Sequence, residues 1–166
     1  MVKPLMVVAL LLLSGCTTAP SPTSVSRGCA YDVRRDVIPA WARTGFSGPS
    51  PSGYPYVLGT HGDILGVVFG YPLAAPAAAD RDNKILWVSR VPVTAPATLT
   101  LTARQDGVPR PETREVAGGP GPSIIDLPRP GCWHVTLTWS GHTDTVDLRY
   151  EGASTSRISA SLGVRS

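Results

Sequence analysis

Two alternating segments near the C-terminus constrain the fold of this chain most strongly. In residues 132–139 every second position is apolar: Trp133, Val135, Leu137 and Trp139. Residues 142–150 alternate again, with Val146, Leu148 and Tyr150 on one face. Alternate side chains of a strand point to opposite faces of a sheet. Between the segments stands Ser140-Gly141, and glycine supplies the positive φ that a tight turn requires. The pattern therefore predicts a β-hairpin with one buried face.

Shorter strand signals precede this hairpin and are separated by turn residues. Residues 84–90 place β-branched and aromatic residues between charged ends, and residues 97–104 alternate strictly. Further short strands are expected at residues 31–33, 54–58, 64–69, 114–117 and 123–127. Glycine and proline number seventeen each, which favours many turns. About seven short strands predict an all-β chain, an immunoglobulin-like β-sandwich, with a partly open β-barrel as the alternative.

Two segments break this series of strands. Residues 36–43 are expected to form one helical turn or a short helix, with Pro39 early in it. Residues 70–82 are rich in proline and alanine and are expected to form a loop. Four tryptophans are candidates for the core or for a stacking platform. The alternation favours the core for Trp87, Trp133 and Trp139, while Trp41 either anchors its segment or contacts a partner.

The N-terminus has the order of a secretory signal peptide. A short head containing Lys3 precedes an apolar run from Leu5 to Leu13, and small residues follow. Nine apolar residues are too few to span a bilayer, which needs about 20. The run ends in Leu13-Ser14-Gly15-Cys16, which resembles the lipobox of bacterial lipoproteins. The resemblance implies cleavage before Cys16 and thioether lipidation of that residue. An ordinary signal peptide with an incidental cysteine is the alternative.

The sequence thus predicts four segments. Residues 1–15 are a cleaved signal peptide, and residues 16–28 are the lipidated cysteine with a tether rich in serine, threonine and proline. Residues 29–150 form the β domain, and residues 151–166 form a disordered tail. The expected location is the extracytoplasmic face of the cell membrane, with the lipid on Cys16 as the contact to the bilayer.

Two cysteines remain after Cys16 is set aside. A pair of cysteines in an exported domain predicts a disulfide, here between Cys29 and Cys132. It would close a loop of about 100 residues, worth about 4–5 kcal/mol in the chain-entropy description. Two buried free thiols are the alternative.

Charge and motifs exclude several function classes. The net charge of +3 includes no basic block, so nucleic acid is not an expected partner. The chain lacks a Gly-x-Ser-x-Gly elbow, a phosphate loop and a dinucleotide fingerprint. Six carboxylates are available for acid–base chemistry, but no spacing pairs any two: Asp63, Asp126, Asp144, Asp147, Glu112 and Glu115. For Asp147, on the outer face of its strand, a cross-strand charge pair is the simpler interpretation.

Metal binding has only weak candidates. His142 and Asp144 share a face of the predicted strand, and His61 and Asp63 repeat the spacing in a turn. These four residues form a cation site only if the two turns lie at the same end of the sandwich. No metal and no cofactor are expected.

Three segments resemble uncharacterised actinobacterial lipoproteins: residues 41–46, residues 83–88 and the stretch from Gly131-Cys132-Trp133 to Gly141-His142-Thr143-Asp144. The resemblance implies export, a lipid anchor and a β domain, and it names no catalytic residue. We expect a lipid-anchored, non-catalytic binding or interaction module with an envelope protein or polymer as partner. The alternatives are an enzyme or accessory acting on envelope polymers, and a carrier of a small ligand or metal.

Overall fold

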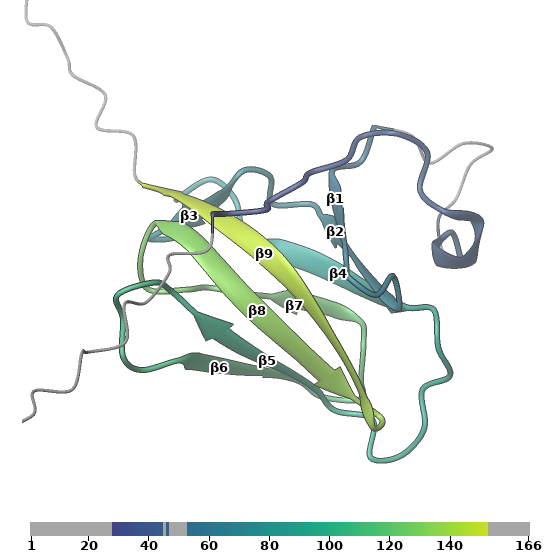
Figure 1. The fold of residues 1–166 in the computed structure, drawn as a ribbon. Coiled ribbons are helices and arrows are strands. Elements are labelled where there is room, and N and C mark those ends of the chain that lie inside the picture. Colours follow the sequence, from purple (N-terminus) through teal and green to yellow (C-terminus); the bar gives the residue numbers. More distant parts are fainter. Residues whose placement is uncertain (1–27, 45, 47–52, 153–166) are drawn as a thin grey trace, which may run out of the picture.

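The structure is a computed structural model that describes residues 28–44, 46 and 53–152, and this part of the chain is all-β (Figure 1). The strands are β1 (Tyr56–Leu58), β2 (Ile64–Val68), β3 (Leu73–Ala75), β4 (Lys84–Ser89), β5 (Leu99–Arg104), β6 (Glu112–Val116), β7 (Pro122–Ile124), β8 (Gly131–Trp139) and β9 (His142–Gly152). A single 3₁₀ turn, η1 (Ala40–Ala42), is the one helix in these residues. None of the described helical structure has the length and apolar character needed to cross a bilayer.

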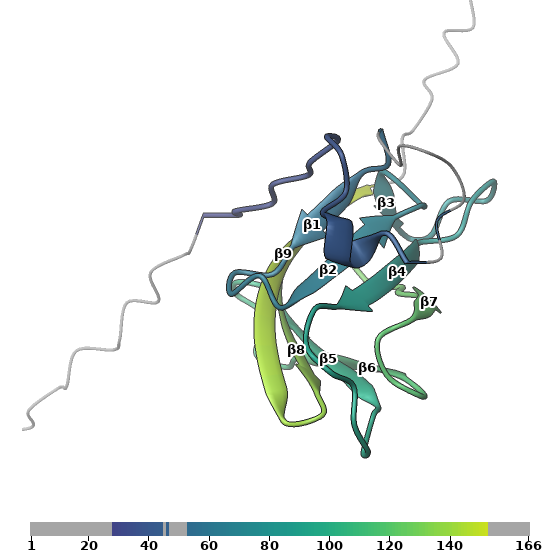
Figure 2. The same cartoon turned by 90° about the vertical axis from the view of Figure 1, so that its right-hand side faces the viewer.

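The strands form two sheets. One has the order β1-β2-β4-β7, and the other has the order β3-β9-β8-β5-β6. Every pair is antiparallel except β3 with β9. The five-stranded sheet curls like half a barrel beside the four-stranded one (Figure 2). The all-β prediction is therefore confirmed, with nine strands in the described residues where about seven were expected.

The predicted C-terminal hairpin is present as β8 and β9. Its register runs from Trp139 opposite His142 at the turn to Gly131 opposite Tyr150. Ser140 and Gly141 both have positive φ, 46° and 77°, which is the conformation of the tight turn that the sequence predicts. The apolar residues of both strands point to the core and are buried.

The main core lies between the two sheets. Trp87, Trp133 and Trp139 are each at most 1% exposed, which confirms their predicted place in the core. Trp139 donates its indole N–H to Ser89 Oγ at 2.9 Å. Gly66 lies opposite Trp87, where an added Cβ would come within 2.7 Å of the Trp87 ring. The absence of a side chain at residue 66 thus lets the largest side chain of β4 fill the core.

A second, smaller core covers part of the outer face of the four-stranded sheet (Figure 2). Ile38, two residues before η1, and Ala42, the last residue of η1, are fully buried. Trp41 is partly buried against the same cluster, so it anchors its segment to the sheet. The expected helical turn within residues 36–43 is confirmed in shortened form.

Two expectations about local structure are wrong. Residues 31–33 do not form a strand, because this segment crosses from one sheet to the other, and only Arg34 pairs, with Tyr56. Residues 70–82 are not only a loop, because they contain β3. The side-chain amide of Asn83 accepts a hydrogen bond from the N–H of Ala74 and donates one to its C=O, both at 2.9 Å. A buried amide thus supports a three-residue strand that lies between prolines.

Several predictions fall outside the described residues. They are the signal peptide, the lipidated Cys16, the tether as far as residue 27, and the tail from residue 153. The first two residues of the predicted tail, Glu151 and Gly152, belong to β9 and pair with β3, so that part of the prediction is wrong.

Candidate functional site

An open seam lies between the two sheets, and the N-terminal segment crosses it. β1 is an edge strand of the four-stranded sheet, and β3 pairs only with the last three residues of β9. Among the described residues, no strand pairs with the rest of β9 on the side that faces β1. Residues 29–34, which we call the strap, run from the outer face of β8 and β9 across this seam to β1 (Figure 1).

The strap is fixed at both ends. At its start, Cys29 forms a disulfide with Cys132 on β8, with a Cα–Cα distance of 5.7 Å, as the sequence predicts. At its end, Arg34 and Tyr56 exchange two backbone hydrogen bonds of 2.9 Å. Between these points Tyr31 and Val33 pack against the main core. The strap therefore closes the seam with apolar side chains and holds the two sheets together.

Tyr31 fills the seam, and its burial takes a polar hydroxyl out of water. Its hydroxyl is buried and has no hydrogen-bond partner among the described residues. Burial raises the pKa of Tyr31 above its ordinary value, and the negative charge that Tyr71 can carry adds to the effect. The side chain therefore stays a neutral phenol, and its ring supplies packing.

Asp147 joins the strap to the curled sheet. Its Oδ1 accepts a hydrogen bond from His134 Nδ1 at 2.7 Å, and its Oδ2 accepts the N–H of Ala30 at 2.7 Å. His134 lies directly opposite Asp147 on β8, so the carboxylate has a cross-strand hydrogen-bond partner, and that partner is a histidine. On the other side of the ring, His134 Nε2 lies 3.8 Å from an Asp106 carboxylate oxygen. The imidazole is thus held between two carboxylates.

Two hollows flank the strap and share part of their lining. The first, of about 440 Å³, lies between the strap and the turn after β1, and its polar lining includes Asp32, Arg34 and His61. The second, of about 430 Å³, lies on the outer face of the curled sheet beside Arg104 and His134. Both are lined by Ala30, Thr60, Val146 and Asp147. We call the two hollows together the seam groove.

The second hollow combines threonine hydroxyls with the cation of Arg104. Arg104, His134 and Asp147 form one cross-strand row on β5, β8 and β9, and Thr136 and Thr145 lie in the next row. Thr145 and Thr60 share a hydroxyl hydrogen bond of 3.0 Å. These donors and acceptors suit a polar ligand that carries hydroxyl or anionic groups.

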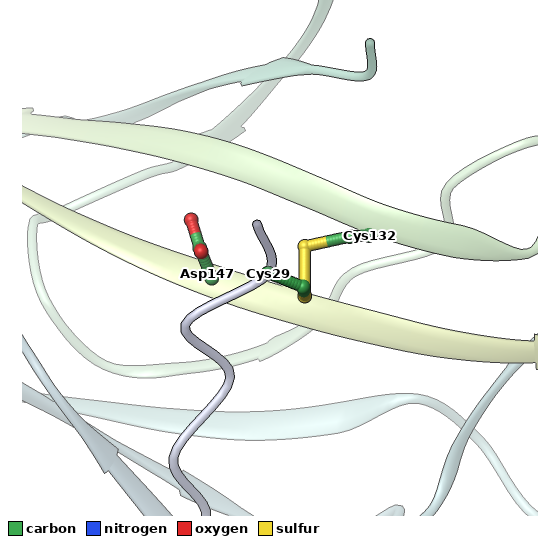
Figure 3. Close-up of side chains that lie close together, drawn as sticks. All are labelled: Cys29, Cys132 and Asp147. Carbon is green, nitrogen blue, oxygen red and sulfur yellow. A yellow bond between two sulfur atoms is a disulfide. The ribbon is translucent and has the colours of Figure 1, made fainter. Parts of the chain in front are cut away.

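One trio of residues has the spacing of metal ligands. Cys29, Cys132 and Asp147 each place a ligand atom within 4.8 Å of the others (Figure 3). The two sulfur atoms are joined in the disulfide, so neither is a thiolate. Both oxygens of Asp147 already accept hydrogen bonds. The trio therefore fits a structural link and does not fit a metal centre.

The four residues predicted as weak metal candidates are only partly brought together. His61 Nδ1 lies 3.7 Å from Asp144 Oδ1, but that ring nitrogen also faces the C=O of Thr143 at 3.3 Å. His142 packs beside Trp139, with ring centroids 5.9 Å apart. Asp63 contributes its backbone N–H to Asp144. The arrangement is a turn organised around Asp144, with no set of convergent ligands in this part of the structure.

Asp144 is a structural carboxylate. It is fully buried at the core-facing position of β9. Its oxygens accept the backbone N–H groups of His61 at 2.9 Å, Asp63 at 3.1 Å and Thr145 at 2.7 Å. Gly59 leaves room for it, because a Cβ there would collide with the carboxylate. Asp144 thus ties the turn between β1 and β2 to the start of β9.

The other carboxylates that the sequence offers for acid–base chemistry also have structural partners. Asp126 accepts a hydrogen bond from the Asn83 amide at 2.7 Å, and Glu112 pairs with Arg114 at 3.3 Å. With Asp144 and Asp147 engaged as described, four of the six are occupied. These four carboxylates therefore hold neighbouring groups of the fold in place.

Comparison of the chain with protein families, with curated proteins and with solved structures returned no match.

The Asp144 carboxylate provides a test of this site. Asp144→Ala removes the acceptor of three buried N–H groups, so we expect the free energy of unfolding to fall by about 3 kcal/mol. The control is Asp63→Ala in the same turn, whose side chain accepts none of these bonds, with an expected change below about 0.5 kcal/mol. Urea unfolding followed by tryptophan fluorescence measures both. Equal losses in the two variants would contradict the role assigned to Asp144.

Proposed function

We propose that this protein is a lipid-anchored, extracytoplasmic, non-catalytic binding module. In this proposal the described domain is an immunoglobulin-like β-sandwich, and the seam groove holds an extended polar ligand of the cell envelope. The observation that carries the proposal is the pair of adjoining hollows, which share the polar residues Thr60 and Asp147 and run along both sides of the strap. Each has a volume in the range of known ligand pockets.

The chemistry of the groove supports binding over reaction. Among the described residues, His134 is the one histidine whose ring is oriented by a hydrogen bond of 2.7 Å to a carboxylate. A general base also needs a substrate proton or a nucleophile beside its free nitrogen. The Nε2 atom of His134 faces the Asp106 carboxylate instead. Arg104 and the threonine hydroxyls can hydrogen-bond a ligand. In this proposal they form and break no covalent bond with it.

The lipid anchor rests on the lipobox at Leu13-Ser14-Gly15-Cys16. The nine apolar residues before it are too short for a bilayer span, and two acyl chains give stable attachment. The disulfide agrees with export, because such bonds persist in oxidising compartments.

Radiolabelled palmitate tests the anchor in an expressing bacterium. We expect the wild-type chain to take up label and to sediment with membranes, and Cys16→Ser to lose the label. Thr17→Ser is the matched control, because it alters the neighbouring residue and leaves the thiol. Undiminished labelling of the Cys16→Ser chain would contradict the anchor.

Photocrosslinking in intact cells tests the groove. Replacing Thr136 by p-benzoylphenylalanine puts the probe in the second hollow. Thr138, two residues further along the same outer face, is the control position, because it is exposed and lies outside the lining of the hollow. We expect an envelope component to be captured from position 136 and not from position 138. Equal capture at both positions, or none at either, would contradict a ligand in the groove.

A further inference from the structure

Exposed apolar side chains gather at one end of the four-stranded sheet, where β1 and β4 begin and β2 and β7 end. Tyr54, Phe69 and Tyr71 are 42%, 43% and 36% exposed, and Ile124 on β7 is 55% exposed. Phe46 joins them, with its ring 5.8 Å from Tyr54 and 6.4 Å from Phe69. We call these five residues the aromatic surface.

Strand register explains why these side chains gather. Lys84 pairs with Ile124 across β4 and β7. Phe69 directly follows β2, and continuing the β2–β4 register by one residue places it opposite Lys84. The centres of the Phe69 and Tyr54 rings are 5.7 Å apart. The segment around η1 covers the neighbouring rows on the outer face of the sheet. The residues of the aromatic surface therefore continue the apolar face that η1 covers, and no element covers them among the described residues.

Two cations lie over the exposed rings. Lys84 Nζ is 5.8 Å from the centre of the Phe69 ring, and Arg35 Cζ is 4.7 Å from the centre of the Tyr71 ring. A sugar that stacks on an aromatic ring needs an open ring face, and each cation takes one face of its ring, which reduces the surface open to a glycan. Aromatic rings beside the stems of Lys and Arg are instead the composition of protein surfaces that enter the membrane–water interface.

We propose that the aromatic surface docks on the phospholipid bilayer that carries the anchor. Its apolar side chains would enter the headgroup region, while Lys84 and Arg35 meet anionic headgroups. The carboxylate of Asp82 lines the same shallow hollow as Lys84 and Ile124, which keeps the preference for anionic lipid modest. This inference rests on the proposed function, because it requires the domain to be held near a membrane.

The length of the tether permits this docking. Gly28 lies twelve residues after Cys16, so the intervening chain spans up to about 40 Å. Stacked sheets lie about 10 Å apart, and the tether can therefore pass from the outer face of one sheet to the outer face of the other. Docking through the four-stranded sheet leaves the second hollow, on the outer face of the curled sheet, turned away from the bilayer. The groove is then open to envelope ligands.

Vesicle sedimentation tests the docking separately from the anchor. The probe protein is the chain from residue 17 to residue 166, which keeps the contacts of residues 28–152 and cannot carry lipid on Cys16. Vesicles contain phosphatidylglycerol and phosphatidylcholine in equal amounts, or phosphatidylcholine alone. We expect wild-type protein to partition onto the mixed vesicles, and Phe69→Ser and Ile124→Ser each to lower the partition coefficient about tenfold. Lys84→Gln should lower it about fivefold on mixed vesicles and less on pure phosphatidylcholine.

The matched control is Val93→Ser. Val93 is 45% exposed, like Phe69, and follows the opposite end of β4. Its replacement should leave partitioning unchanged.

The docking proposal is overturned if wild-type protein does not sediment with mixed vesicles, if Val93→Ser lowers binding as much as Phe69→Ser, or if the two vesicle types bind equally. It is also overturned if the same substitutions abolish dimerisation or sedimentation with purified cell-wall polymer while vesicle binding persists. The palmitate result is independent of all these outcomes, so failure of the anchor and failure of the docking are distinguishable.

Discussion

The attachment of the strap across the seam is the interaction on which the rest of this structure depends. The two sheets share a core, but among the described residues no strand pairs with β9 before Tyr150 on the side that faces β1. A backbone hydrogen bond of 2.9 Å joins the N–H of Thr60, in the turn after β1, to the C=O of Thr145. The strap supplies the missing connection through the Cys29–Cys132 disulfide and through Tyr31 and Val33 in the core. Because the cysteines are 103 residues apart, the bond restricts the unfolded chain over most of the domain.

The same attachment creates the groove. A chain crossing over a curled sheet leaves space on both sides of its backbone, and both hollows are lined by Ala30 of the strap. Asp147 holds the strap against β9 by accepting the N–H of Ala30, and it orients His134 in the second hollow. The groups that stabilise the seam therefore also determine which polar atoms a ligand would meet. The aromatic surface has a different origin, since it lies at one end of the other sheet.

Much of the fold was predictable because its strongest signals are local. Alternation and the Ser140-Gly141 turn set the β8–β9 register, and counting outward from that turn already places His134 opposite Asp147. The groove was not predictable, because it depends on where the strap crosses, and no local pattern in residues 29–34 specifies contacts with β8 and β1. Asp144 was predicted as a possible ligand because it shares a face of its strand with His142. Its three N–H donors come from its neighbour and from a turn more than eighty residues earlier in the chain.

Amide hydrogen exchange by NMR, with and without the disulfide, tests the role of the strap most directly. In a Cys29→Ser/Cys132→Ser variant we predict that protection falls first at Arg34, Tyr56 and Thr60, whose N–H groups bond across or beside the seam. Amides at the centre of the β8–β9 hairpin should keep their protection, although global stability falls by about 2–5 kcal/mol. Unchanged exchange at the three seam amides, or an equal loss throughout both sheets, would contradict the account.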